Sequence, residues 1–206
     1  MISYRRGFVF VHIPKTGGKS VRKALRAYTL NPSERFVQYF ATRTSRRDVY
    51  GIDVATSHAT ARRLRNIIGS DTWHEFYSFA FVRNPWSRVV SEYHFHKKRP
   101  DSAYHDLATN GTLEDFVTHL HAKGAGQQVD FVYDDDGNQI VDFVGKVENY
   151  AEDFARVCAR LRVVAALPHK NQTRHGSYRD ELTPMARDLV SELYADDIAA
   201  FSYRFE

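Results

Sequence analysis

Apolar residues along the chain form short unbroken runs, separated by stretches in which they recur at helical spacing. The run at residues 8–13 is typical of a buried strand, and the following Gly17-Gly18 pair leads into a helical pattern over residues 20–28. A second buried run, residues 76–83, ends at Asn84-Pro85, a pair that predicts an N-cap with Pro in the first helical turn. Buried runs that alternate with helices predict an α/β fold with a mostly parallel sheet.

Weaker patterns fill the rest of the chain. We expect strands at residues 36–40 and 50–55, a helix at 59–68, a helix capped at Thr112, a hairpin with arms at 129–133 and 139–144, a helix that ends near Leu161, and one amphipathic helix over 183–201. Together these elements predict a single three-layer α/β/α domain over residues 1–206, similar to P-loop nucleotide-binding proteins.

Composition narrows the class of protein. A chain of 206 residues with 43% hydrophobic and 26% charged residues is long enough for one domain with a full core. The net charge of +4 suits an anionic ligand. The single cysteine, Cys158, excludes an intramolecular disulfide, and its helical spacing predicts a core position. No run approaches the roughly 20 apolar residues that a membrane span needs, so we expect a cytoplasmic protein without a transmembrane segment.

The loop after the first strand carries the clearest chemical signal. Backbone N–H groups in a turn with glycines, the N-terminus of a helix and the side chains of Lys15 and Lys19 together predict a phosphate or sulfate site. Gly18-Lys19-Ser20 also matches the end of the P-loop pattern GxxxxGK[ST], but Ile13 stands where that pattern needs its first glycine.

Two separated stretches resemble the sulfotransferases that use 3′-phosphoadenosine 5′-phosphosulfate (PAPS), in particular the carbohydrate type of sulfotransferase family 2. Pro14-Lys15-Thr16-Gly17-Gly18 is similar to their 5′-phosphosulfate loop. Arg83-Asn84-Pro85-Trp86, with Ser91 eight residues after the arginine, is similar to their 3′-phosphate motif. The resemblance implies sulfonate transfer from PAPS to an acceptor hydroxyl or amine, without a metal ion.

The resemblance also implies roles for individual residues. Lys15 would stabilise the leaving oxygen, Arg83 and Ser91 would bind the 3′-phosphate, and His58 would be the base. The cradle around the phosphosulfate would consist of Thr16, Gly17, Gly18, Lys19 and Ser20. Lys19 stands where the family usually has a hydroxyl residue, so Lys19 is a second candidate for the catalytic role. Arg174-His175-Gly176 is loosely similar to the late loop with which cytosolic members close over the cofactor.

Two other functions fit parts of this pattern. A small-molecule kinase would use Lys19 and Ser20 with magnesium, and Asp53 would be its metal ligand. A non-catalytic nucleotide- or polyanion-binding module would need no base, and His58 would then be dispensable. We expect the sulfotransferase, with a small-molecule or carbohydrate acceptor and no nucleic-acid partner.

Overall fold

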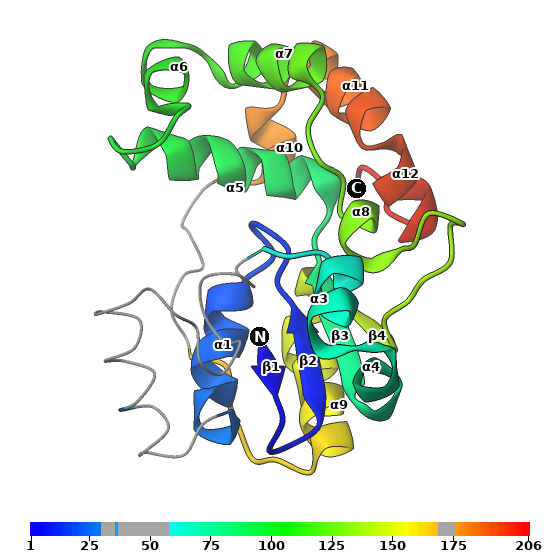
Figure 1. The fold of residues 1–206 in the computed structure, drawn as a ribbon. Coiled ribbons are helices and arrows are strands. Elements are labelled where there is room, and N and C mark those ends of the chain that lie inside the picture. The colour runs from blue at the N-terminus through cyan, green and yellow to red at the C-terminus, as the bar shows by residue number, and fades with distance from the viewer. Residues whose placement is uncertain (30–35, 37–57, 169–175) are drawn as a thin grey trace. The chain divides into compact units, whose positions relative to one another are not determined.

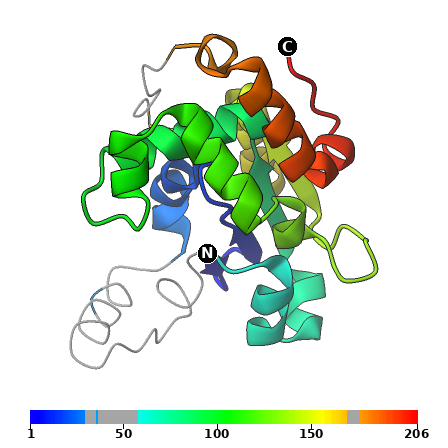
Figure 2. The same cartoon turned by 90° about the horizontal axis from the view of Figure 1, so that it is seen from above.

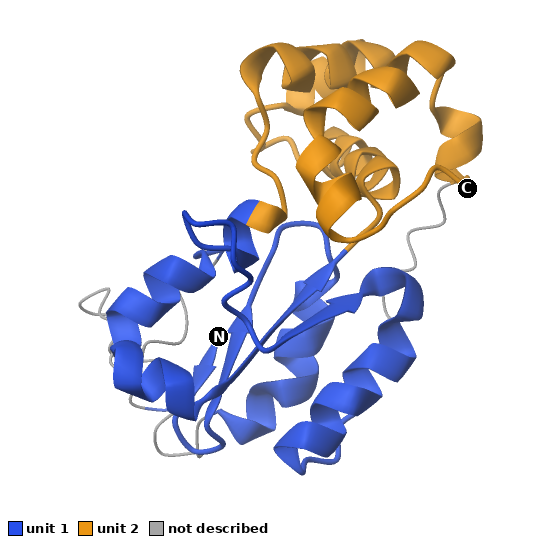
Figure 3. Ribbon diagram, turned by 90° about the vertical axis from the view of Figure 1, so that its right-hand side faces the viewer, with its two compact units in different colours: residues 1–82, 130–170 blue, residues 83–129, 171–206 orange. Residues whose placement is uncertain are grey.

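A computed structural model of the chain describes residues 1–29, 36, 58–168 and 176–206. They belong to two compact units: unit 1 contains residues 1–82 and 130–170, and unit 2 contains residues 83–129 and 171–206 (Figure 3). The expected strand at 50–55 and, apart from Phe36, the one at 36–40 lie outside the described residues. The single domain expected over residues 1–206 stays a prediction.

Unit 1 is built on a four-stranded sheet in the order β1-β2-β3-β4 (Figure 1). Its strands are β1 (Ile2–Ser3), β2 (Phe8–Val11), β3 (Tyr77–Val82) and β4 (Phe143–Lys146). β2 pairs with β3 and β3 with β4 in parallel, whereas the short β1 lies antiparallel to β2. The predicted α/β class with a mostly parallel sheet is therefore confirmed.

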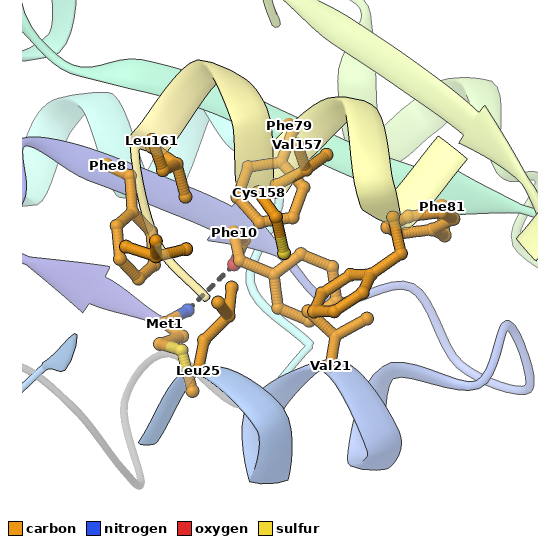
Figure 4. Packing of buried hydrophobic residues seen from close by; sticks show 12 residues of the cluster. Met1, Phe8, Phe10, Val21, Leu25, Phe79, Phe81, Val157, Cys158 and Leu161 are labelled. Carbon is orange, nitrogen blue, oxygen red and sulfur yellow. Dashed lines mark hydrogen bonds between the residues drawn. The ribbon is translucent and has the colours of Figure 1, made fainter. Parts of the chain in front are cut away.

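Helices cover both faces of this sheet (Figure 3). Phe8, Phe10, Phe79 and Phe81 alternate along β2 and β3, and all four pack against one helical layer (Figure 4). That layer consists of α1 (Gly18–Leu25) and α9 (Tyr150–Leu161), and the predicted core residue Cys158 lies in it, only 8% exposed. On the other face, α4 (Ser70–Glu75) contacts β3 and α3 (Ala61–Ile68) packs beside α4. The short 3-10 helices η1 (Arg26–Tyr28) and η2 (Val147–Asn149) adjoin α1 and α9.

Unit 2 is helical. Its helices are α5 (Pro85–Lys97), α6 (His105–Asn110), α7 (Leu113–Lys123), α10 (Tyr178–Glu181), α11 (Pro184–Leu193) and α12 (Ala195–Ala200). α11 packs against α7 and α5 (Figures 1 and 2). Both predicted caps are present: Asn84 Oδ1 accepts from Ser87 N at 3.1 Å, and Thr112 forms a capping box with Asp115. No helix of the described residues is long and apolar enough to cross a membrane.

Two predicted elements are wrong. Residues 129–132 form the short helix α8 (Val129–Val132) rather than a hairpin arm, and β4 pairs with β3 in parallel. Only the antiparallel bridge between Tyr133 and Gln139 remains of the expected hairpin. The tail is two helices instead of one, because the backbone of the fully buried Tyr194 leaves helical geometry, with φ −116° and ψ 32°.

Candidate anion-binding and catalytic site

Unit 1 contains one candidate site, in the loop between β2 and α1, residues 12–17. Lys15 and Gly17 have left-handed φ values of 67° and 74°, and Thr16 Oγ1 closes the turn by donating to Ile13 O at 3.0 Å. Gly17 is the N-cap of α1, which has no side-chain cap and no acidic residue in its first turn. The helix N-terminus therefore carries partial positive charge next to Lys15 and Lys19, which favours an anion.

Close packing explains why glycines stand at the end of this loop, Gly17, and at the start of α1, Gly18. A Cβ atom added at Gly17 would lie 2.7 Å from the Tyr150 hydroxyl, and one added at Gly18 would lie 1.9 Å from Cδ2 of His12. The Tyr150 hydroxyl also donates to Gly17 O at 2.7 Å. Burial raises the pKa of Tyr150, so this phenol stays protonated and remains a donor. Tyr150 therefore contacts the loop at Gly17, and the His12 ring contacts the backbone at Gly18.

His12 connects this loop to His58. The two imidazole rings lie 4.4 Å apart between centroids, and His58 Nδ1 lies 3.0 Å from His12 O. His58 is exposed and has a left-handed φ of 62°. His12 is only 6% exposed, and its Nδ1 has no hydrogen-bond partner among the described residues. In unit 1, the His12 ring therefore lies between His58 and Gly18.

The contacts show which nitrogen of His58 donates, and burial decides the charge of His12. A carbonyl oxygen only accepts, so Nδ1 of His58 carries a hydrogen, and Nε2 takes no part in this contact. The pKa of His12 is lowered to about 3, first because the ring is buried and then because His58 and cations such as Arg22 lie nearby. His12 is therefore neutral at physiological pH, and the exposed His58 is the member of the pair that is suited to accept a proton.

Unit 2 contains a separate candidate site, a pocket of about 170 Å³. Its lining residues are Arg83, Ser87, Val90, Ser91, Gly176, Ser177 and Tyr178. Ser87 and Ser91 are one turn apart on α5, and Arg83 Nε donates to Ser87 Oγ at 3.0 Å. A guanidinium flanked by two hydroxyls suits a phosphate group. The structure thus places Arg83 and Ser91, two of the sequence-predicted residues, on one pocket.

Arg174, His175 and Asp53 lie outside the described residues, although Gly176 to Tyr178, which follow the late loop, line the pocket in unit 2. Among the described residues, no group of three or more His, Cys, Asp or Glu side chains could hold a metal ion.

Sequence reasoning missed His12, Tyr150 and Ser87. The spacing of Ser87 four residues before Ser91 was a usable signal, because i and i+4 share a helix face. His12 and Tyr150 gave no such signal, since their roles depend on packing against Gly18 and Gly17.

A mostly parallel sheet, with a loop that contains Lys15 and Gly17 leading into a helix N-terminus, defines an α/β protein with a candidate anion site. The model of the sulfotransferase family matches residues 1–204, and the chain belongs to this family. An uncharacterized protein of Archaeoglobus fulgidus is 30% identical over 121 residues, which cover 57% of this chain and 91% of that protein. The crystal structure of mouse sulfotransferase SULT7A1 complexed with PAP is similar with a TM-score of 0.46 and 12% identity, over 96% of this chain and 85% of that chain.

Proposed function

We propose that the protein transfers a sulfonate group from PAPS to an acceptor hydroxyl. Membership in the sulfotransferase family supports sulfonate transfer in general. The observation that carries the specific proposal is the contact of the His58 ring with the His12 ring and of His12 with Gly18, which brings a proton acceptor near the loop. A binding module would need the loop but would have no use for the imidazole.

The residues of the loop fit the phosphosulfate end of PAPS. The N-terminus of α1 lacks a side-chain cap, and glycines leave the backbone amides open where a Cβ atom would collide with His12 or Tyr150. We assign the cradle to Thr16, Gly17, Gly18, Lys19 and Ser20. Thr16 is fully buried and bonded to Ile13 O, so its part is to hold the turn, while the backbone and Lys19 contact the anion.

In the proposed reaction, His58 Nε2 accepts the proton of the acceptor hydroxyl as the new S–O bond forms. The S–O bond to the 5′-phosphate breaks, and the Lys15 ammonium stabilises the charge that grows on the leaving oxygen. The products are the sulfated acceptor and 3′-phosphoadenosine 5′-phosphate (PAP). Lys19 shares the cradle and is the second candidate for the role of Lys15.

Arg83 and Ser91 of unit 2 are assigned to the 3′-phosphate, together with Ser87. Arg174 remains a proposed contact to the same phosphate, because the residues that follow it line this pocket. The acceptor is a small molecule or a carbohydrate in this proposal, the location is cytoplasmic, and neither a metal ion nor nucleic acid takes part.

Calorimetric titration separates the proposal from its rivals. We expect tight binding of PAP, weaker binding of adenosine 5′-phosphate (AMP), and no requirement for magnesium. Stronger binding of ATP with magnesium than of PAP would favour the kinase. PAP binding without transfer of ³⁵S-sulfonate to any of four acceptor classes, namely sugars, lipid alcohols, phenols and tyrosine peptides, would favour a binding module.

A further inference from the structure

The backbone of Arg83 is held by a side chain from a distant part of unit 2. Arg83 N donates to Gln128 Oε1 at 2.8 Å, and Gln128 Nε2 donates to Arg83 O, also at 2.8 Å. One side-chain amide thus satisfies both backbone groups of the residue that follows the last residue of β3. The pairing has the donor and acceptor pattern of a neighbouring strand, extended by a single residue.

Gln128 is itself fixed by a fully buried carboxylate. Asp197 Oδ1 accepts from Gln128 N at 2.7 Å and from Val129 N at 2.9 Å, and Asp197 Oδ2 accepts from Gln128 Nε2 at 3.1 Å. Gln128 and Asp197 are both 0% exposed. With its oxygen and both amide hydrogens engaged, the Gln128 side chain has one orientation available.

A buried arginine completes this network. Arg88 Nη1 lies 3.8 Å from Asp197 Oδ2, Arg88 Nη2 donates to Gly126 O at 3.2 Å, and the guanidinium carbon lies 5.3 Å from the centre of the Tyr194 ring. Arg88 directly follows Ser87 on α5, so the same helix contributes to the pocket and to this network.

We propose that Gln128 is a positioning residue that holds Arg83 in place for the 3′-phosphate. The inference rests on the proposed function, in which Arg83 binds that phosphate. Gln128 fixes the Arg83 backbone, and Ser87 Oγ fixes the guanidinium plane through its 3.0 Å bond to Nε. An arginine held at its backbone and at Nε binds a phosphate with both Nη atoms and loses little conformational freedom in doing so.

The test is the ratio of the AMP to the PAP dissociation constant, because only PAP carries the 3′-phosphate. In Gln128→Met, which keeps the side-chain length but not the amide, we expect this ratio to fall about 10- to 100-fold. AMP affinity should stay within about threefold of the native value. Gln127→Met is the matched control: Gln127 bonds α12 through Asp196 Oδ2 and Asp197 N, so its loss should leave the ratio unchanged.

A double-mutant cycle distinguishes positioning from general stability. If Gln128 acts through Arg83, Gln128→Met should not lower the ratio further in an Arg83→Ala background. A ratio that falls equally in both backgrounds, or that is unchanged in Gln128→Met itself, would overturn the inference.

Two further measurements cover a variant that does not fold. Gln128→Asn keeps the amide but shortens its reach, and it should lower the ratio in the same way. In the native protein, the Arg83 amide should exchange its hydrogen at least about 100-fold more slowly than an unprotected amide. Unprotected exchange would refute the hydrogen bond from Arg83 N to Gln128. A native protein that binds PAP and AMP equally would instead refute the 3′-phosphate assignment itself.

Discussion

Replacing Gly18 with alanine should force the start of α1 and the His12 ring apart. The new Cβ atom would lie 1.9 Å from Cδ2 and 2.3 Å from Nε2 of His12, whereas Cβ contacts under 3.0 Å essentially do not occur. The ring or the loop therefore has to move by about 1 Å. His12 has little room to move, because it is only 6% exposed, stacks on Phe10 and contacts the tilted ring of His58.

Overpacking of this kind costs about 1 to 3 kcal/mol of unfolding free energy. At about 2 to 4 °C per kcal/mol for a chain of this size, the melting temperature of Gly18→Ala should fall by about 2 to 12 °C. Thermal unfolding followed by circular dichroism measures this shift, and titration with PAP should show weaker binding because the cradle is displaced. Gly126→Ala is the control, since a Cβ atom there meets nothing within 4 Å.

A second background tests the physical cause. His12→Ala removes the ring, so Gly18→Ala should then cost less than about 0.5 kcal/mol, and the two changes together should be less harmful than their sum. The same loss of stability in both backgrounds would refute the steric explanation.

Three further predictions follow from the site. Arg83→Ala should weaken PAP binding by about 1.5 to 3 kcal/mol with little change for AMP, as measured by calorimetry, and equal losses for both ligands would contradict the assignment. Lys15→Ala should lower turnover much more than PAP affinity, whereas Lys19→Ala should act mainly on affinity; the reverse in kinetic assays would exchange their roles. Because burial lowers the pKa of His12 from 6.5 to about 3, the unfolded chain binds its proton first, and the native protein should lose stability as pH falls from 6.5 toward 3. His12→Gln should flatten this loss in urea unfolding, and an unchanged pH dependence would show that His12 is not its source.

The sequence could predict those elements whose signals are local. The buried run that becomes β2, the glycine pair before α1 and the Asn84-Pro85 start of α5 all fix the backbone within a few residues. The parallel pairing of β2 with β3 also followed from the alternation of apolar runs and helices.

The helix α8 could not be predicted in this way. The amides of Gln128 and Val129 are satisfied by the carboxylate of Asp197, which is 68 residues away from Val129 in sequence. Residues 129–132, three of them apolar and one Asp130, are compatible with either a strand or a helix, so this distant partner decides between them. The same holds for the clamp on Arg83, because nothing near Gln128 in sequence marks it as a partner of that residue.

The candidate site shows the same division. The sequence indicated Lys15, Arg83 and Ser91 through motifs, and His58 through its expected position after a strand. The buried run at residues 8–13 did not indicate that the His12 ring, directly after β2, lies between His58 and Gly18. That arrangement depends on the left-handed backbone at His58, which residue type alone does not predict for histidine.

If His58 is the base in sulfonate transfer from PAPS, the pH dependence of that transfer should reveal it. Transfer of ³⁵S-sulfonate from labelled PAPS should follow an acidic limb in the native protein, since a protonated imidazole cannot accept the hydroxyl proton. His58→Ala should lower kcat by about 10² to 10⁴-fold and remove that limb, while PAP affinity stays nearly native. His121→Ala, at a surface ion pair with Glu192, should keep both rate and limb. Retention of turnover and of the acidic limb in His58→Ala would show that His58 is not the base.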